Sequence, residues 1–73
     1  MNIIAKYNAP NGNCEKDQEA FAIAKKFGAQ LQGSGMWLEE PYERDLSWKI
    51  EKPAGLKMVI ELRLAGLKVT YDS

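Results

Sequence analysis

The sequence predicts a small α+β domain with the element order β-α-β-β-α-β. Alternation of apolar and polar residues in four separate segments indicates strands that bury one face. Between the first two of these segments, residues 13–28 have apolar residues at helical spacing and end signals at both termini. Between the last two, residues 53–65 complete the pattern if they form a second helix.

The first two predicted elements are a strand over residues 1–7 and a helix over residues 13–28. Asn13 can accept hydrogen bonds from the first amides of the helix, and Gly28 suits the left-handed residue that ends it. The buried face of the strand would consist of Met1, Ile3, Ala5 and Tyr7. The helix has a narrow, alanine-rich apolar stripe, which permits close approach to a sheet; it consists of Ala20, Ile23, Ala24 and Phe27, with Phe21 beside it.

Residues 29–51 predict two strands joined by a polar loop over residues 39–43. On the first strand, alternation places on one face Ala29, Leu31, Gly33, Gly35 and Trp37. The Gly33-Ser34-Gly35 sequence indicates a β-bulge or the end of this strand, because a phosphate-binding loop needs a longer glycine spacing followed by Lys. The second strand has the clearest pattern, with Leu46, Trp48 and Ile50 pointing inward and Asp45, Ser47, Lys49 and Glu51 pointing outward.

Residues 53–65 fit two structures. As a helix, the segment would carry Pro53 in its first turn, pair Lys57 with Glu61, and end at Gly66. As a strand, it would follow a hairpin turn at residues 52–55 and alternate mostly polar residues with Met58, Ile60, Leu62 and Leu64. Local alternation favours the strand, because Arg63 interrupts the apolar face of the helix. We expect the helix, because the narrow first helix cannot cover the apolar face of the sheet alone.

A final strand over residues 67–71, with Leu67, Val69 and Tyr71 facing inward, completes the order in either case. The topology resembles the ferredoxin-like βαββαβ sandwich, in which two helices cover one face of a four-stranded antiparallel sheet. The alternative is one helix packed on a five-stranded antiparallel meander. In both, residues 1–73 form a single domain, because the sequence shows no linker, repeat or low-complexity tract. The resemblance is topological and implies no function.

Charge and composition narrow the classes of partner. Ten acidic and ten basic side chains balance, whereas a protein that binds nucleic acid through phosphates usually carries a basic excess. No apolar run approaches the roughly 20 residues of a membrane-spanning helix. Cys14 is the only cysteine, which excludes a disulfide within the chain and favours a reducing compartment. We therefore expect a cytoplasmic protein without membrane contact, and its zero net charge favours a homo-oligomer.

The residue types present argue against catalysis. The chain has no histidine, the commonest general base and metal ligand in proteins. A single cysteine without histidine cannot build a zinc site. Cys14 lies near the start of the first helix, a position that can activate a thiol, but no imidazole is present to act as its base. We expect no enzymatic activity, no catalytic residue, no metal and no cofactor.

An acidic cluster with aromatic neighbours is the strongest candidate for a binding site. It comprises Glu39, Glu40, Glu43 and Asp45 around Tyr42, with Trp37 just before it. Paired carboxylates act as acid and base in glycosidases, but a loop on so small a domain lacks the cleft that such chemistry needs. The spacing also differs from that of an EF-hand loop. Two interpretations stay open, a solvated loop or a recognition surface for an Arg- or Lys-rich partner.

Binding of RNA through the open face of the sheet is disfavoured. RNA-recognition domains of this topology stack bases on aromatic residues of the two central strands. The corresponding outward positions hold neither an aromatic residue nor a basic cluster; they are Ile4, Lys6, Asp45, Ser47, Lys49 and Glu51. Trp48 and Tyr7 fall on the buried alternation instead. A nucleic-acid-binding accessory domain is still an alternative, and it would require basic residues to converge in space, such as Lys6, Lys49 and Lys68.

These observations lead us to expect non-enzymatic binding to another protein with a basic surface. A small neutral domain with an acidic and aromatic edge has the profile of inhibitors encoded by phages and mobile elements, including anti-CRISPR proteins, which block a host protein's surface. A structural or oligomerising role in a larger assembly is a further alternative. The predicted contact residues are Trp37, Glu39, Glu40, Tyr42, Glu43 and Arg44.

Overall fold

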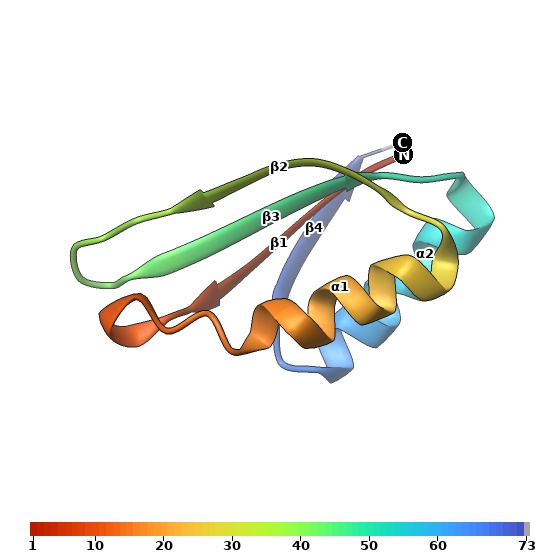
Figure 1. The fold of residues 1–73 in the computed structure, drawn as a ribbon. Helices are drawn as coiled ribbons and strands as arrows, with labels where there is room; N and C mark the ends of the chain where they lie inside the picture. The colour runs from red at the N-terminus through yellow and green to blue at the C-terminus, as the bar shows by residue number, and fades with distance from the viewer. Residues whose placement is uncertain (73) are drawn as a thin grey trace.

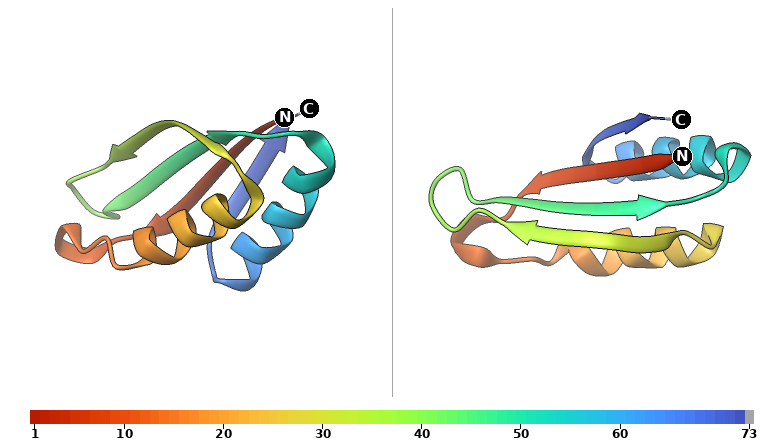
Figure 2. Two further views of the ribbon diagram at one scale, coloured as in Figure 1. Left: turned by 45° about the vertical axis from the view of Figure 1, so that its right-hand side comes forward. Right: turned by 90° about the horizontal axis from the view of Figure 1, so that it is seen from above.

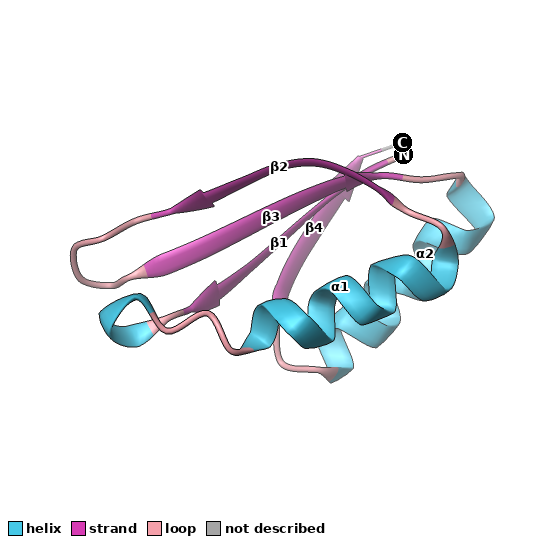
Figure 3. Ribbon diagram, viewed as in Figure 1, coloured by secondary structure: helices cyan, strands magenta, loops and turns pink. Residues whose placement is uncertain are grey.

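The computed structural model describes residues 1–72, which form four strands and two helices in the predicted order. The elements are β1 (Asn2–Asn8), α1 (Lys16–Phe27), β2 (Gln30–Met36), β3 (Glu43–Lys49), α2 (Lys52–Leu64) and β4 (Lys68–Asp72), with a short 3₁₀ turn, η1 (Pro10–Gly12), after β1. The strands form one antiparallel sheet in the order β2-β3-β1-β4 (Figure 1, Figure 3). Both helices lie on one face of this sheet (Figure 2). The fold is the ferredoxin-like sandwich, and the five-stranded meander is excluded.

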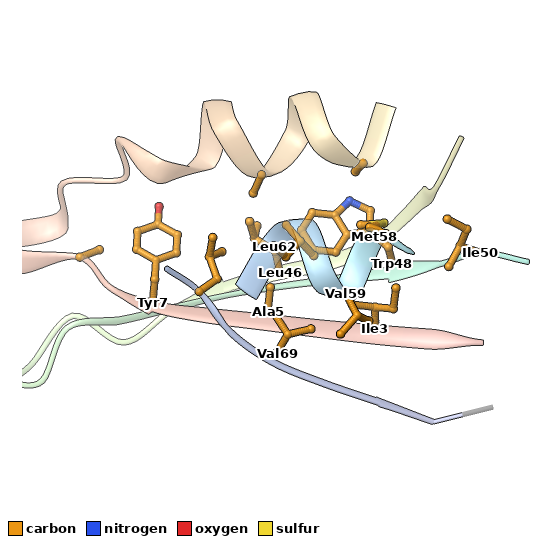
Figure 4. Packing of buried hydrophobic residues seen from close by; sticks show 14 residues of the cluster. Ile3, Ala5, Tyr7, Leu46, Trp48, Ile50, Met58, Val59, Leu62 and Val69 are labelled. Carbon is orange, nitrogen blue, oxygen red and sulfur yellow. The ribbon is translucent and has the colours of Figure 1, made fainter. Parts of the chain in front are cut away.

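The core fills the space between the sheet and the two helices (Figure 4). The alternation predicted for β1 and β3 is confirmed, because β1 buries every second residue and the predicted inward residues Leu46, Trp48 and Ile50 are buried. The largest side chains that are fully buried are Trp48, Ile3, Leu46, Met58 and Leu62. On the α1 side the buried residues are alanines, so this helix approaches the sheet closely. Its Phe21 meets the indole of Trp48 edge to face, with ring centroids 6.4 Å apart.

The two ends of α1 differ in how well the sequence predicted them. At the C-terminal end, Gly28 adopts a left-handed conformation with φ of 74°, and its N–H donates to the carbonyl of Lys25. At the N-terminal end, the prediction that Asn13 caps the helix is wrong. Its Oδ1 accepts a hydrogen bond from the N–H of Glu15 at 3.2 Å, and the helix begins only at Lys16. The Asn13 side chain therefore bonds within the turn that precedes α1 and not to the first turn of the helix.

Residues 53–65 form a helix, as the need to cover the sheet predicted. Pro53 lies in the first turn of α2, and Gly66 follows its end with φ of 93°. The predicted pairing of Glu61 with Lys57 is wrong, because α2 packs beside α1 and turns Glu61 toward it. The carboxylate accepts a hydrogen bond from the ammonium of Lys26 at 2.9 Å.

The predicted alternation of β2 holds for only part of the strand. Leu31 lies opposite Trp48 and faces the core side. Between Leu31 and Gly33 a bulge then shifts the register. After the bulge Gly33 pairs with Ser47 on the open face, and the one-face alternation expected for residues 29–37 is wrong there. On β4, Tyr71 lies on the helix side as predicted but stays 47% exposed. This strand forms the edge of the sheet, and the α2 residue over the ring is Arg63, whose guanidinium carbon lies 6.0 Å from the ring centroid.

Gly55 marks a close approach of α2 to the start of β1 and should resist substitution. A Cβ atom there would lie 2.9 Å from Cγ2 of Ile50 and would clash with Sδ of Met1. Overpacking of this kind costs about 1–3 kcal/mol, more than the roughly 1 kcal/mol gained in helix propensity. Gly55→Ala should therefore lower the free energy of unfolding, measured by urea titration. The exposed Lys57→Ala substitution in the same helix is the control, and an equal or higher stability of Gly55→Ala would contradict the packing shown here.

Candidate functional site

The loop that joins β2 to β3, residues 37–42, lies at the end of the sheet opposite the chain termini (Figure 1, Figure 2). Trp37 is 60% exposed and its neighbour Leu38 is 72% exposed. A shallow hollow of about 310 Å³ lies against these two residues, between Met36 and Glu39. We call residues 37–42 the hairpin loop. Two large apolar side chains side by side in solvent are typical of a contact surface.

Backbone hydrogen bonds hold the hairpin loop in one shape. The N–H of Trp37 donates to the carbonyl of Glu43 at 2.8 Å, and the N–H of Tyr42 donates to the carbonyl of Glu39 at 2.6 Å. Two further bonds attach the loop to the segment after β1. The N–H of Ala9 donates to the carbonyl of Tyr42 at 2.7 Å, and Nδ2 of Asn8 donates to the carbonyl of Pro41. The loop is therefore ordered before any partner arrives, which reduces the entropy lost on binding.

Tyr42 has a backbone conformation that large residues rarely adopt. Its φ is 53°, in the left-handed region, which costs an L-residue roughly 1–2 kcal/mol. The hydrogen bond from Ala9 to its carbonyl helps to keep it there. A bulky residue where Gly or Asn would cause less strain is often found in a functional segment. This strain is the second feature that distinguishes the hairpin loop from an ordinary solvated turn.

The six predicted contact residues are divided between surface and interior. Trp37, Glu39 and Glu40 project into solvent, and Tyr42 is half-buried. Glu43 is also half-buried and lies 3.8 Å from the ammonium of Lys6. The side chain of the sixth residue, Arg44, turns inward and is only 17% exposed. Four of the six therefore belong to the hairpin loop, Glu43 adjoins it, and the guanidinium of Arg44 lies beneath it.

Arg44 belongs to a hydrogen-bonded network at the root of the hairpin loop. Its Nη2 donates to Oδ2 of Asp17 at 2.7 Å, and its Nε bonds both carboxylate oxygens at 3.2 Å. The hydroxyl of Tyr7 donates to Oδ1 of the same carboxylate. In Figure 4 the Tyr7 ring rises from β1 with its hydroxyl directed toward α1. The network joins β1, α1 and β3 at one point.

Burial and charge set the protonation of this network. Burial, together with the hydrogen bond to Asp17, raises the pKa of Tyr7, so its hydroxyl stays a donor. Burial by itself would raise the pKa of Asp17, but hydrogen bonds from Arg44 and Tyr7 outweigh it and lower that pKa below 3.8. The hydrogen bond with Asp17 raises the pKa of Arg44. Asp17 is therefore a carboxylate at neutral pH, and its charge is matched.

Sequence reasoning missed a second exposed apolar surface, on α2. Leu56, Ile60 and Leu64 recur every four residues and point away from the sheet, and Leu64 is 82% exposed. We call these three residues the α2 stripe. Lys57 and Arg63 flank it and are exposed as well. The spacing is visible in the sequence, but there it was counted toward the core of a strand or helix.

The basic residues proposed for a nucleic-acid site converge only in part. Lys6 and Lys68 are register partners on β1 and β4. Lys49 pairs with Asn2 at the other end of the sheet and does not join them. Trp48 and Tyr7 are buried, as predicted, so they offer no stacking platform on the open face. The arrangement lacks the features that RNA-binding sheets use.

Within residues 1–72, no three or more acidic or cysteine side chains are grouped in a way that could hold a metal ion. Cys14 is half-buried, and its Sγ lies 3.5 Å from the carbonyl of Gly12. No helix in the described part of the chain has the length and apolar character needed to cross a bilayer.

No protein-family model matches the chain, and comparisons with curated proteins and with solved structures found none of significant similarity.

The Asp17–Arg44 pair should make stability depend on acid pH. Asp17→Asn should lower the free energy of unfolding near neutral pH by about 2–3 kcal/mol, because it leaves a largely buried guanidinium without its carboxylate. In the wild-type protein the pKa of Asp17 is lowered on folding. Its contribution is therefore complete above the ordinary value of 3.8 and is lost as pH falls through the lower folded value.

Urea titrations at neutral pH and at a series of acidic pH values measure both effects. Glu19→Gln, which removes an exposed carboxylate from the same helix, is the matched control and should leave the acid dependence nearly unchanged. An acid dependence for Asp17→Asn as steep as that of the wild type would show that this pair does not set it.

Proposed function

We propose that the protein is a non-enzymatic binding module that places its hairpin loop on a basic surface of another protein. The observation that carries this proposal is the pair of exposed apolar residues, Trp37 and Leu38, on a loop held by hydrogen bonds on both sides. Glu39 and Glu40 follow them directly and are exposed. An apolar anchor beside carboxylates suits a partner with an apolar pocket rimmed by Lys or Arg.

The apolar and acidic residues would contribute differently to binding. Full burial of a large apolar side chain contributes about 1.5–3 kcal/mol, so Trp37 and Leu38 are the expected source of affinity. Exposed carboxylates at the rim of an interface mainly raise the association rate and the specificity. Binding should therefore weaken with added salt because association slows, while contacts of the tryptophan determine how long the complex lasts.

The size of the molecule limits where the interface can lie. A stable interface takes about 800 Å² from each partner, roughly a sixth of the accessible surface of 4804 Å². The hairpin loop is too short to supply that area by itself. Residues Pro10–Gly12 of η1 adjoin it across a hollow of about 390 Å³ lined by Asn8, Pro10, Asn11, Glu40, Pro41 and Tyr42. We infer an interface that covers the hairpin loop and η1 together.

Occupation of a basic surface would make the protein an inhibitor wherever that surface binds nucleic acid or another acidic ligand. Glu39 and Glu40 would take the place of the acidic groups that the surface normally binds. The small inhibitors encoded by phages and mobile elements act in this way, and the proposal includes that class.

Substitution of the exposed anchor should remove binding without loss of stability. The double variant Trp37→Ala/Leu38→Ala should capture the partner at least about tenfold less well than wild type, while its melting temperature stays the same. The measurement is affinity capture from lysate of the source cells with quantitative mass spectrometry. Ile4→Thr, an exposed apolar change on the open face of the sheet, is the control. If the double variant captures the partner as well as the Ile4→Thr control does, the proposal is refuted.

Self-association is a second candidate function, and the α2 stripe favours it. Three large apolar residues in solvent on one helix face are a recurrent dimer contact, and the zero net charge opposes association little. The occupant would be the same stripe of a second copy. Because the exposed Lys57 side chains of the two copies would then approach one another, added salt should strengthen the association.

Sedimentation analysis over a range of concentrations tests the second candidate. The wild type should associate more as concentration and salt rise, whereas Leu64→Lys should stay monomeric, because Leu64 contributes little to the core. Leu38→Lys, the same change at the hairpin loop, should associate like the wild type. A wild-type protein that stays monomeric throughout, or association that only Leu38→Lys abolishes, would exclude the α2 stripe as the contact.

A further inference from the structure

A basic cavity lies beside the end of β1, separate from the exposed face of the hairpin loop. Its volume is about 330 Å³, and its walls come from β1, the starts of α1, β3 and β4, the hairpin loop and the turn between α2 and β4. Three lysines line it, Lys6, Lys16 and Lys68, against a single carboxylate, Glu43. A volume of this size falls at the lower end of the range for small-molecule sites.

The cavity exists because β4 is shorter than its neighbour. β1 pairs with β3 from Asn2 to Asn8, but it pairs with β4 only as far as Lys6, opposite Lys68. No residue of β4 therefore lies opposite Asn8. The residues that flank β1 bond to the residues that flank β3, because Met1 accepts from the N–H of Ile50 and Ala9 donates to the carbonyl of Tyr42. Since the direction alternates along a strand, the N–H of Asn8 points to the β4 side, into the space that β4 leaves open.

Two of the three lysines, Lys6 and Lys68, are placed in a way that costs the fold stability. Lys6 and Lys68 are opposite one another on neighbouring strands, an arrangement that costs stability because the charges are alike. Glu43 lies 3.8 Å from the ammonium of Lys6 and relieves part of this repulsion. On the opposite wall, the Lys16 ammonium donates to the carbonyl of Ala65 at 2.8 Å, which fixes its position at the cavity.

The geometry points to a binding site for a phosphate group, carried by a small phosphorylated molecule or by free phosphate. Lys6 and Lys68 would bind it from one side and Lys16 from the other, with the N–H of Asn8 as a backbone donor. Ammonium groups bind phosphate as point charges and adapt to its orientation. The bound dianion would offset the repulsion between Lys6 and Lys68, so ligand and fold would stabilise each other.

The neighbouring charges favour a small ligand over a nucleic acid. The hairpin loop forms one wall of the cavity through Pro41, and its residues Glu39 and Glu40 are exposed close by in the sequence. Acidic residues near the cavity disfavour the many phosphates of a polyanionic strand more than they disfavour a single phosphate group. Lys49, at the far end of the sheet, cannot extend the site along a strand of nucleic acid. The site does not depend on the proposed contact with a partner protein.

Amide-resolved NMR titrations at constant ionic strength test this site. Inorganic phosphate and ribose 5-phosphate are the two ligands, and ribose is the control without phosphate. Saturable shifts should appear at the amides of Asn8, Gly66 and Lys68. If ribose 5-phosphate binds more tightly than inorganic phosphate, the ligand is a phosphate monoester; equal affinities identify free phosphate as sufficient. Ribose should produce no shift in either case.

Variants separate a built site from general attraction to positive charge. Lys68→Gln and Lys16→Gln should each weaken binding about tenfold, the value expected for one charge-assisted hydrogen bond. Lys49→Gln removes an equal charge outside the cavity and should leave the affinity unchanged. Lys68 is exposed on an edge strand, so its variant tests the site even if Lys16→Gln fails to fold. Shifts that do not saturate, or that Lys49→Gln reduces as much as Lys68→Gln does, would overturn the proposal.

Discussion

The need to bury one apolar face of a four-stranded sheet determines most of this structure. β1 and β3 are the central strands, and they bring Ile3, Leu46 and Trp48 to the same side of the sheet, where all three are buried. One helix with an alanine stripe cannot cover that area, so the second helix must cover the rest. The ambiguous segment of the chain becomes α2 because a strand there would leave this face in water. Long-range burial thus outweighs local alternation.

The same arrangement separates the core, which is packed between the sheet and the helices, from the hairpin loop, which is exposed to solvent. The hairpin loop lies at the end of the sheet away from the chain termini, and its residues Trp37 and Leu38 are largely exposed. The network of Arg44, Asp17 and Tyr7 closes the interior just before that end. At this edge of the core the network holds the elements together by charge and hydrogen bonds in place of apolar contacts. A rigid base of this kind lets the loop present large side chains without unfolding.

The candidate site was predictable to the extent that it lies in one continuous segment. Trp37, Glu39 and Glu40 are exposed on one loop because a turn between strands must run over the surface. Arg44 was grouped with them because it follows in the sequence, yet the pleat of β3 turns it inward to Asp17. The basic cavity draws its lysines from three elements, so no local pattern could have indicated it. The spacing of the α2 stripe was visible in the sequence. The stripe could not be told from core residues there, because the sequence does not say which face of the helix packs on the sheet.

By itself, the sequence determined the first four elements and the last strand, the buried faces of β1 and β3, the exit from α1 at Gly28 and the lack of any imidazole. These properties depend on neighbours along the chain, namely on periods of two or near four and on single residues with special backbone freedom. Only the tertiary structure decided that residues 53–65 are helical, that Glu61 pairs with Lys26, and that Lys6 meets Lys68. Those outcomes depend on which surfaces become buried together, and that is a property of the whole chain.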